Sequence, residues 1–411
     1  MGKNRDSALF DCNPEKELAF SLQEYGQRLT KIRKQMLADG IDLLWLMAPE
    51  SLYYVSGYKC EWYQAQSPKQ WPATSGIAVH VDHDEFILFD TLSEQIMCRM
   101  VTCCTDIRIF PIEERRDGIQ FIVDELKAKG WLSGTVGMEF HSYRPNPAIS
   151  KRFQSRFESV GCGVVDGSDI LRDIRWVKSA QEIAYIEEAA RLTDIGLDAA
   201  RNTIAPGVME LEVWGEIMGA MGRAGGENPA ITLPVLSGFK ANTGHSLSSR
   251  KIIQKDEVVN VDVSGVYNRY HCNAARSFYV GTPPDEIADY HAKSLGVFDI
   301  IGKLLRPNLM VGEMVRACRD YYDSVGISSD AGWVGGYELG LAFPPDWVGN
   351  FVYELSDIES EKVFEPGTIV NYETQFFGPN QSGITYCICS LLFKENEAVF
   401  PVKTPRELIV V

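Results

Sequence analysis

The sequence lacks any apolar run of about 18 or more residues, so we expect no transmembrane helix. Positive charge is also scarce, because 40 Lys and Arg residues stand against 56 Asp and Glu residues, which gives a net charge of −16. A strongly acidic protein repels nucleic acid and anionic membranes, and we therefore expect neither as a partner. Residues 1–24 mix charges of both signs and contain no apolar stretch typical of a secretory signal, which favours a cytoplasmic location.

Motifs that bind zinc or build disulfide scaffolds are absent as well. The 10 cysteines form no CxxC pair, and the 6 histidines form no HExxH or HxH pair. Zinc sites usually draw on such pairs, and small secreted scaffolds draw on regularly spaced cysteines. We therefore expect reduced, mostly buried thiols and no histidine-rich zinc site.

What is present is an alternation of helix and strand patterns that changes character partway along the chain. Over residues 21–157 short apolar strands alternate with amphipathic helices, which indicates an α/β layer. A boundary is expected near residues 169–179, and it divides the 411 residues into domains 1–172 and 173–411. The second part favours an α+β domain. Its expected helices are 179–203, 211–224, 285–305 and 311–326, and its expected strands are 258–263, 277–280, 369–377 and 384–393.

Two acids interrupt apolar strand patterns, and a histidine lies in a polar loop. Asp262 lies in VVNVDVSG and Glu373 in VNYETQF, and an acid in a buried strand needs a partner. Asp262 could be a base, a nucleophile, a metal ligand or a structural aspartate bonded to a backbone amide. His245, in the loop NTGHSLSS, has a side chain suited to general acid–base chemistry, although an exposed histidine without function also fits. Pairing of Glu373 with Asp262 or His245 would account for its position.

Two further segments carry candidate binding residues. YNRYHCNAARS contains Arg269, His271 and Arg276, and an arginine there could hold a carboxylate or form a structural salt bridge. GGYELGLAFPPDW contains Tyr337 and Trp347, whose rings could line a site for a small molecule or fill a packed turn.

These segments, in this order, resemble the creatinase/prolidase family over nearly the whole chain. The helical opening WVKSAQEIAYIEEAA at 176–190 and the ending KTPREL at 403–408 are similar to the family's segments at those points. The resemblance implies an α+β protein with a creatinase-like N-terminal α/β domain and a C-terminal pita-bread domain. It also implies a homodimer.

The family's metallopeptidases bind two metals through two aspartates, one histidine and two glutamates. The resemblance places these ligands on Asp262, Asn273, Tyr337, Glu373 and a position at or near Cys387. Three of the five ligand types are therefore missing, and asparagine and tyrosine are poor substitutes in a dinuclear site. The resemblance thus implies a member of the metal-free branch, with no cofactor.

Among metal-free members, the resemblance points to creatinase and, more closely, to ectoine hydrolase. His245 is similar to the catalytic histidine of creatinase and Glu373 to a glutamate that holds guanidinium, but a second such glutamate falls on Ala275. RYHC, GGENPAITLPVLSG and GYELGLAFPPDW resemble segments of ectoine hydrolase, and GYKCEW resembles its loop with a substrate-facing tryptophan, here Trp62. Two positions depart from that group, because ectoine hydrolase has a glutamate at the position of Asp262 and, we expect, an uncharged residue at that of Glu373.

The resemblance implies a metal-independent hydrolase that cleaves an amidine-type C–N bond of a small zwitterion. A creatinase-like amidinohydrolase, a lyase acting on an osmolyte such as dimethylsulfoniopropionate, and a binding module without activity remain alternatives. Asp262 would hold the cation with Glu373 or attack it directly, and His245 would move the proton. The expected substrate-binding residues are Trp62, Arg269, His271, Arg276, Tyr337 and Trp347.

Overall fold

The computed structural model describes residues 13–61, 74–110 and 117–411. The chain forms two compact units that divide between Arg175 and Trp176, whereas the sequence predicts a division after residue 172. Each unit has its own hydrophobic core. Among the described residues, no helix combines the length and the hydrophobicity that a membrane crossing requires.

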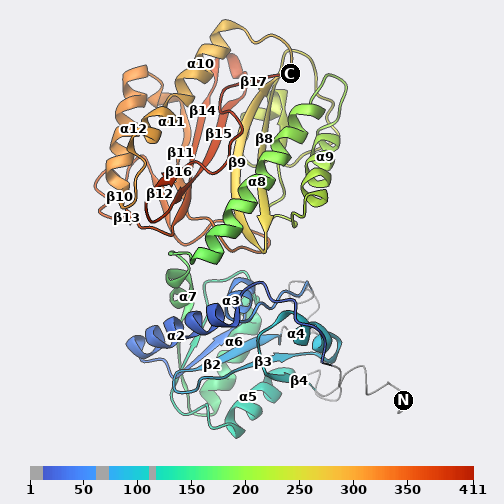
Figure 1. The fold of residues 1–411 in the computed structure, drawn as a ribbon, viewed down its shortest axis with the longest axis vertical. Coiled ribbons are helices and arrows are strands. Elements are labelled where there is room, and N and C mark those ends of the chain that lie inside the picture. The colour runs from blue at the N-terminus through green and yellow to red at the C-terminus, as the bar shows by residue number, and fades with distance from the viewer. Residues whose placement is uncertain (1–12, 62–73, 111–116) are drawn as a thin grey trace. The chain divides into compact units, whose positions relative to one another are not determined.

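The first unit is built on a mixed sheet with the strand order β4-β3-β2-β1-β5-β6 (Figure 1). β1 pairs antiparallel with β2 and parallel with β5. The strands are β1 (Leu43–Leu46), β2 (Gly76–His80), β3 (Phe86–Asp90), β4 (Asp106–Ile109), β5 (Thr135–Met138) and β6 (Gly163–Asp166). The helices are α2 (Leu22–Asp39), α3 (Pro49–Ser56), α4 (Gln95–Val101), α5 (Gly118–Ala128), α6 (Pro147–Ser159) and α7 (Ser168–Ile174), with a 3-10 turn at Leu92–Glu94.

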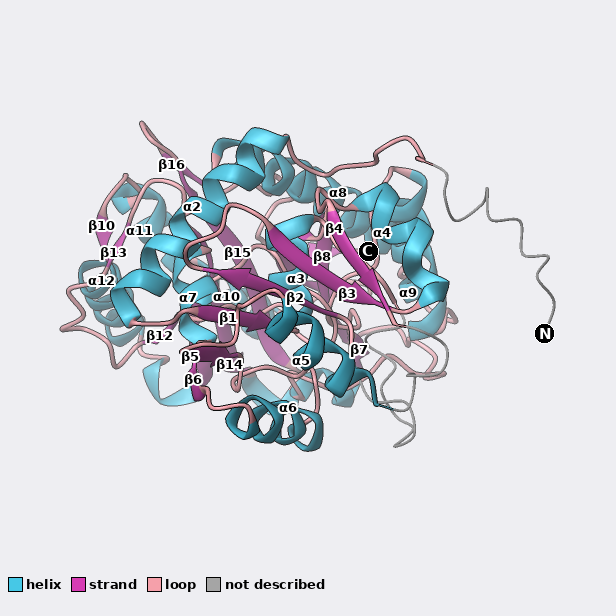
Figure 2. Cartoon of the chain, turned by 90° about the horizontal axis from the view of Figure 1, so that it is seen from below, coloured by secondary structure: helices cyan, strands magenta, loops and turns pink. Residues whose placement is uncertain are grey.

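Helices cover both faces of this sheet. The apolar faces of α5 and α6 pack on the central strands, where Trp45 contacts Phe153, and Figure 2 shows α2 on the opposite side. Ser21 caps the start of α2, because its hydroxyl accepts a hydrogen bond from the Glu24 backbone N–H. Gly40, in the left-handed conformation, caps the end of the helix.

The second unit is built on a nine-stranded sheet whose main path is β12-β11-β14-β15-β9-β8-β7. Its strands are β7 (Val235–Ser237), β8 (Val258–Tyr267), β9 (Tyr270–Tyr279), β11 (Ala331–Tyr337), β12 (Val352–Glu354), β14 (Ile369–Phe377), β15 (Ile384–Phe393), β16 (Ala398–Val399) and β17 (Ile409–Val410). β10 (Leu309–Met310) and β13 (Val363–Phe364) form a separate pair. The helices are α8 (Ala180–Thr203), α9 (Glu210–Arg223), α10 (Asp285–Leu295), α11 (Val297–Leu304) and α12 (Val311–Val325), with 3-10 turns at Gly238–Asn242, Ser328–Asp330 and Pro379–Gln381.

One face of the second sheet is covered by helices. α8 packs across β8 and β9 (Figure 1), and α11 and α12 share a core with the apolar side chains of β14 and β15. The approach of α8 is close, because a Cβ on Gly265 of β8 would lie 2.1 Å from the Ala189 carbonyl oxygen. Side chains alternate along each strand, so the polar residues between these apolar ones lie on the other face.

Two elements differ from the sequence-based expectation. The helix expected at 285–305 is two helices, α10 and α11, which meet at Gly296, where a Cβ would lie 2.0 Å from the Tyr321 hydroxyl. The strands expected at 258–263 and 277–280 are longer and pair as the hairpin of β8 and β9. The polar residues of this hairpin weaken its apolar pattern, although every one of its strand residues except Tyr267 is buried.

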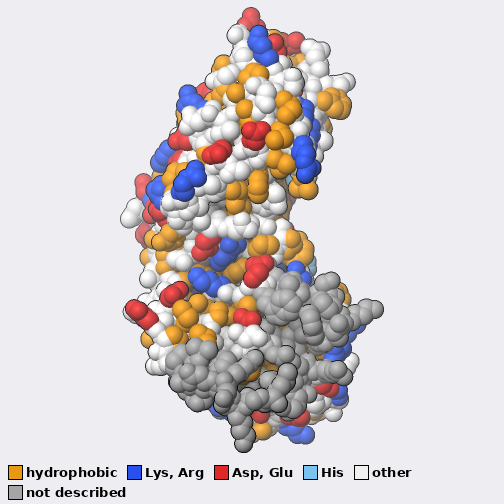
Figure 3. Space-filling view, turned by 90° about the vertical axis from the view of Figure 1, so that its right-hand side faces the viewer, with side chains coloured by type: hydrophobic (Ala, Val, Ile, Leu, Met, Phe, Trp, Pro, Cys, Tyr) orange, Lys and Arg blue, Asp and Glu red, His pale blue; other side chains and the backbone are white. Residues whose placement is uncertain are grey.

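The excess of acid is not gathered in one patch on the face drawn in Figure 3. On its described part, acidic and basic side chains are interspersed with apolar ones. The formal net charge of −16 is therefore spread rather than concentrated on this side.

Candidate active site

A row of paired residues crosses the sheet of the second unit and carries an acid near each end. Asp262 of β8 pairs with Ala275 of β9, Ala275 with Ile388 of β15, and Ile388 with Glu373 of β14. Side chains paired in this way point to the same face. Asp262 and Glu373 therefore share the face opposite α8, α11 and α12.

Asp262 is enclosed by neutral hydrogen-bond donors. Asp262 is 6% exposed, and Asn273 Nδ2 lies 3.3 Å from its Oδ1. The hydroxyl of Tyr386 lies 3.3 Å from its Oδ2.

Glu373 has an environment of the same kind. Asn371 Nδ2 donates to its Oε1 at 2.9 Å, and Gln375 Nε2 donates to its Oε2 at 3.1 Å. The Tyr337 hydroxyl also bonds this carboxylate, and Trp347 Nε1 donates to that hydroxyl at 3.1 Å. Tyr337 and Trp347 thus lie on the Glu373 side of the site.

A chain of amides joins the two acids. Asn371 Nδ2 lies 3.3 Å from Asn273 Oδ1, and Asn273 in turn donates to Asp262. The hydrogen bonds that reach both carboxylates come from amide or phenol groups, none of which carries a charge.

Burial without a charged partner among the described residues shifts the pKa values of both acids. Burial, followed by the charge of Glu373, raises the pKa of Asp262 to about 8. Burial also raises the pKa of Glu373 to about 7, although hydrogen bonds from Tyr337, Gln375 and Asn371 oppose the shift. The site thus holds two carboxyl groups that take up protons near neutral pH.

The residues at the family's ligand positions do not fit a two-metal site. Asn273 supplies a neutral amide, and burial holds the pKa of Tyr337 well above its usual value, so this phenol stays neutral. The oxygens of Asp262 and Glu373 already accept the hydrogen bonds described above. Within the described ranges, no group of three or more His, Cys, Asp or Glu side chains has an arrangement that could hold a metal ion.

Cys387 does not occupy the fifth ligand position. Its side chain packs in the core shared with α11 and α12, on the face away from Asp262. Tyr386, one residue earlier, points to the site and bonds Asp262. The expected position is therefore shifted by one residue, because the connection between β14 and β15 sets the register.

The loop that carries His245 is adjacent to the Glu373 side of the site. His245 itself is exposed, and the preceding Gly244 is close enough that a Cβ there would lie 3.1 Å from Gln375 Oε1. Gln375 is also the residue that donates to Glu373. Gln375 therefore connects the histidine loop to the acid pair.

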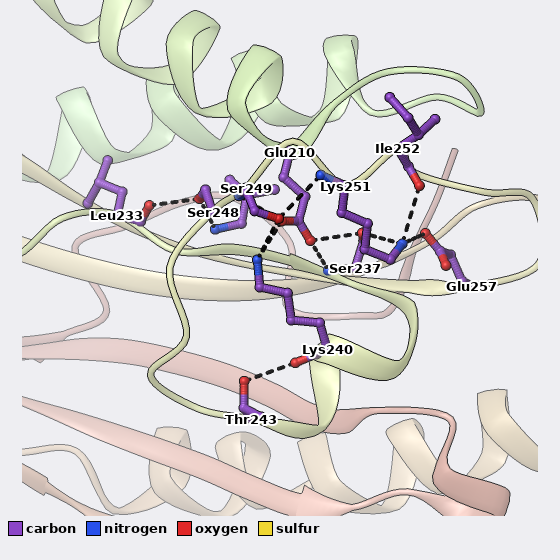
Figure 4. Close-up of polar contacts among 11 residues, drawn as sticks. Glu210, Leu233, Ser237, Lys240, Thr243, Ser248, Ser249, Lys251, Ile252 and Glu257 are labelled. Atoms are coloured by element: carbon purple, nitrogen blue, oxygen red, sulfur yellow. Dashed lines mark hydrogen bonds and ion pairs between the residues drawn. The ribbon is translucent and has the colours of Figure 1, made fainter.

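The base of this loop is held by one buried carboxylate, Glu210, the first residue of α9 (Figure 4). Glu210 accepts hydrogen bonds from Ser237 on the N-terminal side of His245 and from Ser249 on its C-terminal side. Lys240 Nζ lies 2.7 Å from the same carboxylate. The loop is thus anchored on both sides of His245.

The expected binding residues Arg276 and Arg269 hold backbone rather than facing the acid pair. Arg276 lies on the helix-covered face, is 1% exposed, and donates to the carbonyl oxygens of Ala275, Ile388, Thr404 and Pro405. This placement does not fit the expectation that Arg276 holds a substrate carboxylate.

Arg269 occupies the turn between β8 and β9 with a φ of 65°. Its guanidinium donates to the carbonyl oxygens of Asn228 and Ala342 and lies over the Phe343 ring. These contacts join the hairpin turn to the loops that contain Asn228 and Ala342, so Arg269 has a structural role.

His271 lies on the same face of β9 as Asn273, but both of its ring nitrogens are occupied. Nε2 accepts from the Ala230 backbone N–H at 3.0 Å, and Nδ1 lies 3.0 Å from the Arg269 carbonyl oxygen. Burial keeps its pKa well below the usual value, so the ring is neutral and donates from Nδ1. Its ring centroid lies 6.0 Å from that of Trp347, which it supports. Trp62 lies outside the described residues.

Sequence reasoning did not single out Asn371, Gln375 and Tyr386. The first two were accessible in principle, because alternation along β14 places residues two positions from Glu373 on the same face. Tyr386 was not, since its orientation depends on the register of β15.

Comparisons with known proteins match both units. The model of "Metallopeptidase family M24" matches residues 184–389, and that of the "Creatinase/Prolidase N-terminal domain" matches residues 28–177. An uncharacterized hydrolase/peptidase of Sinorhizobium fredii is 26% identical over 405 residues, which cover 96% of this chain and 99% of the relative. A Xaa-Pro dipeptidase of Pyrococcus furiosus is 24% identical, with 93% and 99% covered, and an ectoine hydrolase of Halomonas elongata is 24% identical, with 86% and 90% covered.

Solved structures show the same architecture. The structure of a Xaa-Pro dipeptidase from Bacillus anthracis superimposes with a TM-score of 0.77 at 19% identity and covers 94% of this chain and 100% of the other. This agreement confirms the expected fold, a creatinase-like N-terminal domain followed by a pita-bread domain. The chain therefore belongs to metallopeptidase family M24, and it is a hydrolase of that family with a creatinase/prolidase N-terminal domain.

Proposed function

We propose that the protein is a metal-independent hydrolase that cleaves an amidine-type C–N bond, not a peptide bond, in a small zwitterion. The observation that carries the proposal is the buried pair of Asp262 and Glu373, whose hydrogen-bond donors among the described residues are all neutral. A pair of buried carboxylates without a counter-charge is costly, and a cationic substrate would remove that cost.

An amidinium group matches the acid pair in charge and in shape. Its positive charge is delocalised over a flat group whose N–H bonds can donate to a carboxylate on each side. Trp347 and Tyr337, next to Glu373, offer aromatic surface for such a cation. An amidinium carbon is electrophilic without a Lewis acid, which agrees with a site that has lost the metal-binding side chains.

His245 supplies the proton transfer in this proposal. It takes a proton from water as the water oxygen bonds to the amidinium carbon, and it returns the proton to the nitrogen that leaves when the C–N bond breaks. Asp262 is the alternative nucleophile. In that case its carboxylate oxygen bonds to the amidinium carbon, the C–N bond breaks, and the leaving nitrogen takes a proton from His245. Water then hydrolyses the bond between the carbon and the Asp262 oxygen and returns the proton to His245.

Within this class we propose an ectoine-like cyclic amidine rather than creatine. One relative is named ectoine hydrolase, and the resemblance over three segments supports the same group. A guanidinium substrate would benefit from a second acid beside Asp262, but the residue paired with Asp262 on β9 is Ala275, which is fully buried.

Proton NMR of ectoine and of creatine, each incubated with EDTA-treated protein, tests the proposal. We expect ring-opened acetyl-diaminobutyrate from ectoine and no product with the matched variant Asp262→Asn. Sarcosine and urea would instead indicate a creatinase, and an alkene product from dimethylsulfoniopropionate would indicate a lyase. Turnover that begins only after a divalent metal is added would contradict the proposal.

A further inference from the structure

Glu210 is a fully buried carboxylate outside the acid pair, and it bonds the loop that carries His245. It is 0% exposed and begins α9. Its Oε1 accepts from the backbone N–H and the hydroxyl of Ser237, at 2.9 and 3.0 Å. Its Oε2 accepts from Lys240 Nζ at 2.7 Å and from the backbone N–H and hydroxyl of Ser249, both at 2.9 Å.

The five donors come from the two ends of one loop, as Figure 4 shows. Ser237 and Lys240 precede His245, and Ser249 follows it. The α9 backbone adds two more ties to the second end, since Glu210 N–H donates to the Lys251 carbonyl and Leu211 N–H donates to the Ser249 carbonyl. The first turn of α9 thus holds both ends of the loop at a fixed separation.

The tip at residues 244–247 makes few contacts of its own. Its flanks are also held from outside the Glu210 network, because Asn242 Nδ2 donates to the Gln381 carbonyl oxygen and the Ser248 hydroxyl accepts from the Val235 backbone N–H. The side chains of His245 and Leu247 are exposed, and Gly244 touches the site only through Gln375. A short exposed tip takes its position from its ends, because little else restricts its backbone. The position of His245 relative to Glu373 therefore depends on the contacts that hold the two ends of the loop, and Glu210 is the side chain that bonds both ends.

We propose that Glu210 is a positioning residue, whose carboxylate clasps both ends of the 237–249 loop and so fixes His245 beside the acid pair. This inference rests on the proposed function, in which His245 moves the proton. Glu210 does not touch the reacting atoms. Its replacement should lower kcat through the histidine and leave substrate binding by Asp262 and Glu373 in place.

The variant Glu210→Gln tests the hydrogen bonds of Glu210 to the two ends of the loop with minimal change in side-chain volume. Its amide nitrogen replaces one oxygen and would face either the donors of Ser237 or those of Lys240 and Ser249, so one end of the loop is released. Ser249→Ala is a milder second variant. It removes the hydroxyl that donates to Glu210 and accepts from Lys240 Nζ and the Lys251 backbone N–H, and it keeps the charge pair between Glu210 and Lys240. Asp194→Asn is the matched control, because Asp194 of α8 likewise accepts from the backbone N–H groups of Lys403 and Thr404, away from the site.

Amide hydrogen exchange measures how firmly Glu210 holds the two ends of the loop, and it does not depend on enzyme activity. We expect the amides of Ser237 and Ser249 to exchange at least about 10-fold faster in Glu210→Gln and to a smaller degree in Ser249→Ala. Asp194→Asn should leave them unchanged. Unchanged exchange in Glu210→Gln, with the fold retained, would overturn the proposal.

A double-mutant cycle on the proposed reaction then separates positioning from general stability. Glu210→Gln should lower kcat by about 10-fold or more with KM within about 2-fold, and should have almost no effect in a His245→Ala background. An equal loss of kcat in both backgrounds would refute a role through His245. If Glu210→Gln keeps full turnover while His245→Ala loses it, this inference fails alone. If His245→Ala keeps full turnover, the proposed function has failed, and this inference fails with it.

Discussion

At the scale of single residues, Asp262 and Glu373 are held in a state that is unfavourable for the folded protein when they are charged. Burial raises the pKa values of both acids, to about 8 and about 7. A carboxyl whose pKa is higher in the folded than in the unfolded state contributes stability below the unfolded pKa. That contribution is lost as pH rises through the folded pKa. The charged acid pair therefore lowers the free energy of unfolding at neutral and alkaline pH. Such a loss is common at sites whose charge is neutralised only when a ligand binds.

Asp262→Asn should stabilise the folded protein at about pH 9 and have little effect at about pH 4, because it removes a buried charge and keeps the side-chain shape. A pKa shift of one unit corresponds to about 1.4 kcal/mol, so we expect a gain of at least about 1 kcal/mol at the higher pH. Urea unfolding at both pH values measures it. Asp194→Asn, whose carboxyl lies outside the site, serves as the control. A variant that is less stable than wild type at the higher pH would contradict this account of the acid pair.

At the scale of elements, the sequence predicts which residues share a face more reliably than it predicts how strands pair. Alternation along β8 predicts that Asn260, Asp262 and Ser264 share one face. In the structure Asp262 points to the site, and Val263 lies against Gly196 of α8 on the other face. The register of β15 depends on a connection of variable length, so Tyr386 rather than Cys387 faces Asp262. The pairing of Ala275 with Ile388 of β15 joins strands that are far apart in the sequence, and it cannot be read from any local pattern.

The role of Arg276 likewise could not be predicted from the local sequence. Its side chain bonds the C-terminal segment, which lies far from β9 in the chain. Its guanidinium donates to four backbone carbonyls, two of them in Thr404 and Pro405.

Arg276→Met should destabilise the protein by about 2–4 kcal/mol, because the buried carbonyls of β15 and the C-terminal segment lose their donors. KM should not change, since the side chain lies away from the acid pair. Thermal unfolding and steady-state kinetics measure the two effects. Arg223→Met, whose side chain is 71% exposed, should change stability by less than about 0.5 kcal/mol. A rise in KM without loss of stability would restore Arg276 as a substrate-binding residue.

At the scale of the whole molecule, the family fold does not by itself determine the chemistry of the site. The two units, the family matches and the superposition with a dipeptidase establish the architecture. The side chains at the ligand positions, however, supply two carboxylates, one amide and two phenols. One fold can host different chemistries, because the reaction depends on the site residues and not on the architecture.

EDTA should leave the thermal unfolding temperature of the protein unchanged, and added Mn²⁺ or Zn²⁺ should not raise it. A metal bound to the folded state at 100 times its Kd would add about 2.7 kcal/mol of stability, which such a scan detects readily. Scanning calorimetry before and after dialysis measures this. A fall in the unfolding temperature on chelation that added metal reverses would show that the donor set does bind metal.

Calorimetry of ectoine binding to His245→Ala in EDTA measures whether the acid pair itself holds a cationic substrate. Titrations in buffers of different ionisation enthalpy give the number of protons released. Because a bound cation lowers the pKa values of Asp262 and Glu373, we predict release of more than about one proton near pH 6.5, falling toward zero above about pH 9. Asp262→Asn in the same background should release fewer protons. Binding without proton release, or binding that appears only after metal is added, would contradict the account.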